Sequence, residues 1–89
     1  MTEIVKRASA GTMESSDVYV EIEPAESGLT VELHSVVQKQ FGASIEAVVQ
    51  EVLRECGVEK AQILVRDRGA LECVIRARVE TAVLRSKEG

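Results

Sequence analysis

The segment LTVELHSVVQKQFGASIEAVVQEVLRECGVEKAQILVR, residues 29–66, changes its hydrophobic period twice. Its first residues alternate apolar and polar side chains, as do residues 61–66, and this alternation is typical of half-buried strands. Between them, apolar side chains recur at the spacing of one helical face, at Val37, Phe41, Ile45, Val48, Val49, Val52, Leu53 and Cys56. The segment therefore predicts a strand, a helix and a second strand.

The ends of this helix have their own signals. Gly42 interrupts the apolar face, which favours a helix start at Ser44 as N-cap, with Glu46 in the positive first turn. Gly57 follows the last apolar position and is well placed to end the helix.

Outward from this segment, residues 17–23 also alternate, and turn-forming residues at 24–28 link them to the next strand. These two strands are expected to form an antiparallel hairpin. Further on, residues 67–69, Asp-Arg-Gly, are a hairpin turn signal. Residues 71–85 fit two patterns. Alternation favours a strand to about Arg78 followed by a short helix, and a single helical face also fits.

These elements predict an α+β fold. We expect a two-layer sandwich with an antiparallel sheet of about four strands (β-β-α-β-β), one long helix and a short C-terminal helix. Residues 1–16 have no periodic pattern, and the small side chains at 8–12 predict a flexible N-terminal arm that ends in an exposed loop. Residues 17–89 are expected to form a single domain, because 89 residues suffice for one core.

The composition limits the classes of function. Aromatic residues make up only 2% of the chain, which offers little for a ligand pocket or a base-stacking surface. Residues 14–59 carry ten acidic side chains against two basic ones, which disfavours nucleic-acid binding.

We find no apolar stretch long enough for a membrane span and no secretory signal, so we expect a cytoplasmic protein. Cys56 and Cys73 lack CxxC spacing and are expected to be free, buried thiols.

Groups suited to catalysis are sparse. His34, the single histidine, lies on the polar face of a predicted strand, so a surface position is favoured over a catalytic one. One histidine and two distant cysteines do not make a metal cluster, and the scattered glycines do not make a phosphate-binding loop. The chain lacks the usual residues of a free-standing enzyme, and a small enzyme that uses His34 is the weakest alternative.

Residues 11–17, Gly-Thr-Met-Glu-Ser-Ser-Asp, come directly before the first predicted strand. Composition alone indicates a polar loop in which a serine or aspartate caps a turn. With Val18, however, this stretch resembles the N-terminal motif of the citrate lyase acyl carrier proteins, the gamma subunits of that complex. Residues 37–42 and 67–80 resemble two further blocks of the same family, in the same order, so the resemblance covers about residues 8–85.

The resemblance implies a carrier role without catalysis. It implies that Ser15, the serine after glutamate in the motif, is joined through a phosphodiester to 2'-(5''-phosphoribosyl)-3'-dephospho-CoA, whose thiol carries acetyl or citryl. Ser16 is adjacent, so the choice of Ser15 depends on the motif alignment. The implied partners are the citrate lyase alpha subunit (acyl transferase), the beta subunit (citryl lyase) and a prosthetic-group transferase, with no nucleic acid and no membrane. An exposed, mobile loop suits a serine that must enter another enzyme's active site.

Two alternatives stay open. A malonate decarboxylase-type carrier bears the same kind of arm, although the Glu-Ser-Ser-Asp context and the Gln-Phe-Gly block favour citrate lyase. The second alternative is an unmodified small α+β regulatory or interaction domain. It would bind a partner through its sheet face or through a group of arginines, whose solvation on a hairpin is the simpler interpretation: Arg66, Arg68, Arg76 and Arg78.

The acidic residues that flank the attachment site suggest a further hypothesis. Glu14 and Asp17 would repel the phosphates of the arm at short range and keep the arm off the carrier's surface. Ordinary turn solvation is the alternative interpretation of both carboxylates.

Overall fold

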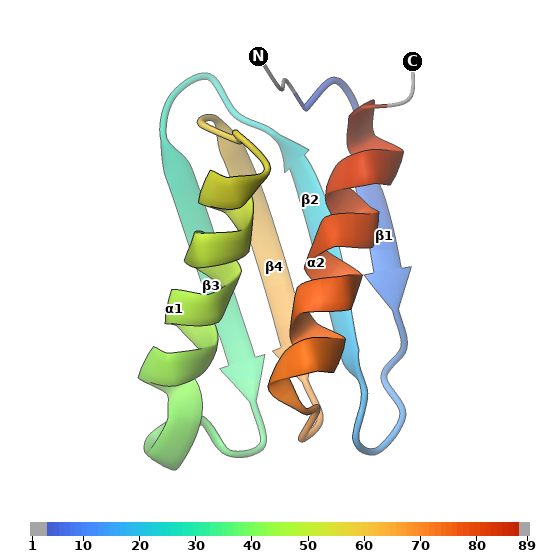
Figure 1. Cartoon of the computed structure of the whole chain (residues 1–89), viewed down its shortest axis with the longest axis vertical. Helices are drawn as coiled ribbons and strands as arrows, with labels where there is room; N and C mark the ends of the chain where they lie inside the picture. Colours follow the sequence, from blue (N-terminus) through green and yellow to red (C-terminus); the bar gives the residue numbers. More distant parts are fainter. Residues whose placement is uncertain (1–3, 88–89) are drawn as a thin grey trace.

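The computed structural model describes residues 4–87, which form one sheet covered by two helices. The elements in chain order are β1 (Ala8–Gly11), β2 (Val18–Pro24), β3 (Leu29–Ser35), α1 (Gln38–Glu55), β4 (Ala61–Asp67) and α2 (Glu72–Lys87). Both helices lie on the same face of the sheet, and no helix or strand of residues 4–87 covers the other face (Figure 1). The predicted two-layer α+β architecture is therefore confirmed.

The strand order in the sheet is β1-β2-β4-β3. β4 lies between β2 and β3, so the expected hairpin between those two strands is wrong. β2 pairs antiparallel with β4, whereas β3 and β4 are parallel, so the sheet is mixed and the expected fully antiparallel sheet is wrong. The parallel pair follows from α1, because a helix of 18 residues is about 27 Å long and returns the chain to the end of the sheet where β3 began.

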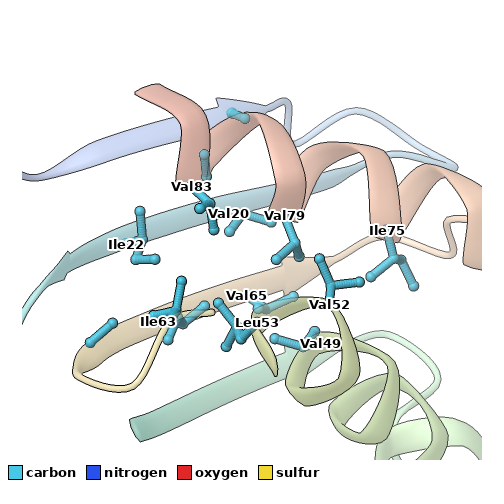
Figure 2. Close-up of a cluster of buried hydrophobic side chains, with 14 of the residues drawn as sticks. Val20, Ile22, Val49, Val52, Leu53, Ile63, Val65, Ile75, Val79 and Val83 are labelled. Atoms are coloured by element: carbon cyan, nitrogen blue, oxygen red, sulfur yellow. The ribbon is translucent and has the colours of Figure 1, made fainter. Parts of the chain in front are cut away.

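The core lies between the sheet and the helices. Figure 2 shows side chains from β2, β4, α1 and α2 that point toward one another, among them Val20, Ile63, Val52 and Val79. Each of these four is at most 2% exposed. All are aliphatic, which agrees with the 2% of aromatic residues in the chain, and burial of such side chains is the main stabilising contribution to a domain of this size.

Residues 8–11, expected within a flexible arm, instead form the edge strand β1. Ala8 pairs with Ile22 and Gly11 with Tyr19 in antiparallel register. Ala10 is buried, and the Arg85 guanidinium of α2 donates to the Ser9 carbonyl oxygen at 2.8 Å. The small side chains thus let α2 lie close over the edge of the sheet. They gave no alternating signal because they supply little apolar surface of their own.

Residues 72–87 form one continuous helix, so the favoured prediction of a strand to about Arg78 is wrong and the single-helix alternative is confirmed. The buried residues of α2 share the helical spacing: Ile75, Val79, Ala82, Val83 and Ser86. Cys73 and Ala77, which belong to the alternating pattern, are exposed. The β-branched content had favoured a strand, but packing against the sheet and α1 overrides such local propensity.

Helix α1 begins at Gln38 rather than at Ser44. Its N-cap is Val37, whose carbonyl oxygen accepts from the Phe41 N–H at 2.9 Å, and Gly42 is buried inside the helix without breaking it. The predicted end is confirmed. Gly57 has φ +74°, and the Val58 N–H donates to the Leu53 carbonyl at 2.9 Å, which is the closing bond of a Schellman motif. Neither helix within residues 4–87 is long and apolar enough to cross a bilayer.

Candidate functional site

Residues 12–17 form the loop between β1 and β2, here called the serine loop. Figure 1 places it at the same end of the molecule as the turn between β4 and α2. Ser15 and Ser16 are exposed central residues of a turn that the Asp17 N–H closes by donating to the Glu14 carbonyl at 3.1 Å. Ser15 Oγ makes no hydrogen bond with any residue of the described range 4–87. The hydroxyl singled out from the sequence is thus accessible and unengaged within that range.

The Asp17 carboxylate holds the serine loop together. It accepts from Thr12 Oγ1 at 2.6 Å, from the Val18 N–H at 2.7 Å, and from Arg78 of α2 through Nε at 3.2 Å and Nη2 at 3.0 Å. Only 15% of the Asp17 side chain is exposed. The hypothesis that Asp17 repels phosphates as a free anion is therefore wrong for this residue, because a two-point contact with Arg78 neutralises it.

The turn after β4 holds the serine loop from a second side. The Arg68 carbonyl accepts from the Ser16 N–H at 2.8 Å, and the Arg68 N–H donates to the Asp17 carbonyl at 2.9 Å. The Arg68 guanidinium reaches further along the loop and donates to the Met13 carbonyl at 3.1 Å. The predicted turn at residues 67–69 is present, with Gly69 at φ +90°, but it leads into α2 instead of a fourth hairpin strand.

The electrostatics of Asp17 give a testable pH dependence. The Thr12 hydroxyl, the Val18 N–H and Arg78 lower the pKa of Asp17 from 3.8 to about 2. Between these two values the unfolded chain binds more protons than the folded one. The stabilisation by ionised Asp17 should therefore be complete above about pH 4 and lost as the pH falls through about 2. A carbon-detected NMR titration of the Asp17 carboxyl checks this, and a midpoint near 3.8 would contradict the network. Asp17→Asn should remove this part of the acid sensitivity.

The four arginines proposed as one surface have separate positions. Arg78 and Arg68 contact the serine loop, whereas Arg76 pairs with acidic residues of both helices. Its Nη2 lies 2.8 Å from Glu51 Oε1, and its Nε lies 3.4 Å from Glu72 Oε2. Arg66 is exposed on β4, on the strand positions that face away from the helices. They do not form a single anion-binding cluster.

The other residues that the sequence offered for chemistry are spread over the surface. His34 is exposed on β3, and its Nε2 lies 2.7 Å from Glu32 Oε2. Cys56 and Cys73 are free, but Cys56 is half-buried and Cys73 is exposed, so the expectation of two buried thiols is wrong. Burial raises the pKa of the Cys56 thiol above its usual range. We find no group of metal-ligating side chains suited to an ion within residues 4–87.

A shallow apolar groove of about 360 Å³ lies between the N-terminal half of α1 and the first turn of α2. Phe41 and Leu71, which are 52% and 71% exposed, contribute to its walls, and Gly69 and Ala70 of the β4–α2 turn line it as well. Asp67, buried at its base, accepts from Ser35 Oγ at 2.8 Å and from the Ala70 N–H at 2.9 Å. The groove and the serine loop thus share the β4–α2 turn.

Comparison with known proteins places this geometry in a family. The model of the family described as "Malonate decarboxylase delta subunit (MdcD)", an acyl carrier protein (ACP) family, matches residues 5–86. The citrate lyase acyl carrier protein of Pectobacterium atrosepticum is 55% identical over 86 residues, which cover 97% of this chain and 90% of that protein. Citrate lyase acyl carrier protein 2 of Salmonella paratyphi A is 56% identical, over 96% of this chain and 89% of that protein.

The chain belongs to the citrate lyase acyl carrier protein family. The resemblance drawn from the three sequence blocks is therefore confirmed. A chain in the crystal structure of a Pseudomonas malonate decarboxylase hetero-tetramer in complex with malonate has the same fold. Its TM-score is 0.81 at 22% identity, with 94% of this chain and 87% of that chain covered.

Membership in the citrate lyase acyl carrier protein family makes this chain a non-catalytic carrier of acyl groups. That role agrees with an accessible serine and with the scattered positions of His34 and the cysteines. Sequence reasoning missed the roles of Thr12, Arg68 and Arg78. Both arginines fall within the third family block, residues 67–80, but nothing in their local pattern connects them to a loop more than fifty residues away.

Proposed function

We propose that this chain is the acyl carrier subunit of citrate lyase and carries acetyl and citryl thioesters on a phosphoribosyl-dephospho-CoA arm attached to Ser15. One observation supports this above all others. The Gly-Thr-Met-Glu-Ser-Ser-Asp motif of a citrate lyase carrier family member forms an exposed, anchored loop with a free hydroxyl at its turn.

The residues around Ser15 are suited to a phosphodiester link. The Ser15 side chain faces solvent, and the hydroxyl of Thr12 is already committed to Asp17 at 2.6 Å. Arg78 compensates the charge of Asp17, so no unpaired carboxylate from that residue opposes a phosphate at the neighbouring turn. When attached, the arm supplies the thiol that bears the acyl group, while this chain holds the attachment point in place.

We further propose that the partners are the citrate lyase alpha subunit, an acyl transferase, and the beta subunit, a citryl lyase. The fold neighbour from Pseudomonas belongs to a hetero-tetramer, which supports assembly of this carrier with other subunits. A covalent tether keeps the acyl group at high effective concentration near both active sites. A separate prosthetic-group transferase is the partner that recognises the serine loop.

The mass of the protein tests this proposal. Co-expression with the prosthetic-group synthesis and transfer enzymes should increase the intact mass by one phosphoribosyl-dephospho-CoA unit. Electron-transfer fragmentation of tryptic peptide 8–39 should then place the added mass on Ser15. A curated relative, such as the Pectobacterium atrosepticum carrier, serves as positive control in the same cells. An unmodified chain beside a modified control would contradict the proposal and favour an unmodified interaction domain.

A malonate decarboxylase-type carrier is the second candidate, because the family model and the fold neighbour both carry that name. The loaded, acetylated carrier separates the two. Mixed with citrate lyase alpha and beta subunits, it should restore oxaloacetate formation from citrate. Restored decarboxylation of malonate with the other enzyme's subunits, and no activity with citrate lyase subunits, would favour the second candidate.

A further inference from the structure

We propose that Arg78 and Asp17 act as a clamp that fixes the serine loop and thereby directs attachment of the arm to Ser15 rather than to Ser16. This inference rests on the proposed function, because it concerns the same attachment site. Both are positioning residues, because their side-chain hydrogen bonds join them to each other, to Thr12 and to the Val18 N–H, and not to the Ser15 hydroxyl.

The clamp joins two parts of the chain that are far apart in sequence. Arg78 lies on α2, 61 residues after Asp17. Its Nε donates to Asp17 Oδ1 and its Nη2 donates to Asp17 Oδ2. The same carboxylate also accepts from Thr12 at the start of the serine loop and from the Val18 N–H at its end. One aspartate therefore connects both ends of the loop to the helix layer, and a two-point contact fixes orientation as well as distance.

The backbone of Ser16 has a conformation that the serine loop would not favour without its contacts to the rest of the chain. Ser16 has φ +66° and is the only non-glycine residue with positive φ in the described range 4–87. The left-handed conformation is unfavourable for a residue with a Cβ, and it persists where the surroundings enforce it. Here the clamp and the hydrogen bond from the Ser16 N–H to the Arg68 carbonyl, at 2.8 Å, enforce it.

This conformation makes the two neighbouring serines different. Within a fixed turn, the hydroxyls of Ser15 and Ser16 leave the backbone at different positions, so a transferase that recognises the rigid loop meets one of them in the reactive position. Without the clamp, Ser16 can return to negative φ and the turn can rearrange. The two hydroxyls then become interchangeable on a flexible segment, and loading also becomes slower because the loop must be ordered at the transferase.

The test compares Arg78→Met with Arg76→Met in the full chain. Both substitutions remove a guanidinium from α2 and keep an apolar stem, but Arg76 pairs with Glu51 and Glu72, away from the serine loop. Purified transferase and the prosthetic group, activated as a phosphoanhydride, load each variant: the serine oxygen forms a bond to phosphorus, the bond from phosphorus to the phosphate leaving group breaks, and the hydroxyl proton is released. The readouts are KM and kcat, the modified residue by fragmentation of peptide 8–39, and amide hydrogen exchange of residues 12–17 in the unloaded protein.

For Arg78→Met we expect about a tenfold loss in kcat/KM, mainly through KM, because the cost of ordering the loop falls on binding. We also expect faster exchange in the serine loop and a measurable share of the arm on Ser16. Arg76→Met should match the wild type in kcat/KM, in hydrogen exchange of the serine loop and in the modified residue. Arg78→Lys should recover part of the kcat/KM that Arg78→Met loses. Loading of Arg78→Met at the wild-type rate on Ser15 alone, with unchanged exchange, would overturn the proposal.

Two further points keep the test decisive. Asp17→Asn is nearly isosteric and breaks the same clamp from the loop side, so it is expected to give the same mixed loading of Ser15 and Ser16. It replaces Arg78→Met in the test if that variant does not fold. A wild-type chain that accepts no arm at all would instead contradict the proposed function. In that case hydrogen exchange of the unloaded variants still reports whether Arg78 orders the loop.

Discussion

Replacing Ser15 with alanine should abolish loading completely while leaving the fold unchanged. The substitution removes the hydroxyl that we propose as the phosphodiester oxygen, and the clamp keeps Ser16 out of the reactive position. The Ser15 side chain is exposed and makes no hydrogen bond within residues 4–87, so the free energy of unfolding should change by less than about 0.5 kcal/mol. Intact mass after co-expression with the modifying enzymes measures the loading, and urea denaturation measures the stability.

Ser16→Ala is the matched control for this experiment. It removes the neighbouring hydroxyl from the same turn but leaves Ser15, so the full mass increase should remain. A mass increase on Ser15→Ala, mapped to Ser16, would contradict the directing role of the clamp. A mass increase that is lost in Ser16→Ala and kept in Ser15→Ala would show that the assignment within the motif is reversed.

Gly11→Ala should destabilise the carrier by about 3 kcal/mol or more. Gly11 ends β1 at φ +92°, and a Cβ built there would lie 1.8 Å from the Val18 carbonyl oxygen and 3.3 Å from Arg78 Cδ. The carbonyl belongs to β2 and cannot move without disturbing the sheet, so the β1–β2 connection and the clamp are both displaced. In a domain of this size the expected loss lowers the melting temperature by about 12–24 °C, which calorimetry measures directly.

Gly28→Ala is the control that separates the predicted Cβ clash at Gly11 from the strain of a positive φ. Gly28 also has positive φ, at +70°, but a Cβ there meets nothing within 4 Å. Gly28→Ala should therefore lower the free energy of unfolding by only about 1 kcal/mol, because alanine is unfavourable in this backbone conformation. Equal destabilisation by the two substitutions would show that the close approach of Gly11 to β2 contributes nothing.

The sequence predicted the elements whose hydrophobic period is unambiguous. β2 and β4 alternate over seven residues each, and their buried positions are apolar, such as Val20 and Val65, except for Asp67 at the end of β4. α1 followed from an apolar face whose buried residues include Val49 and Val52. Such periods reflect which side of an element meets the core, and this is a local property of the chain.

The predictions failed where the local pattern fits more than one structure. Residues 72–78 alternate and also match a helical face, and only packing of Ile75 and Val79 against the sheet selects the helix. Residues 8–11 have almost no apolar surface, so their pairing with β2 depends on a strand edge that another part of the chain provides. The position of β4 between β2 and β3 also depends on long-range contacts, because α1 must first return the chain along the sheet before β4 can pair with both strands.

The sequence by itself determined a small α+β carrier with one modest aliphatic core, and it singled out Ser15 through the motif that surrounds it. Only the tertiary structure decided how that serine is presented. The contact between Asp17 and Arg78 joins residues 61 positions apart, and the contact between Arg68 and Met13 joins residues 55 apart. Hydrophobic period specifies which face of each element is buried. It carries no information about which polar side chains meet once the elements have packed, so the clamp becomes visible only when α2 lies across β1 and β2.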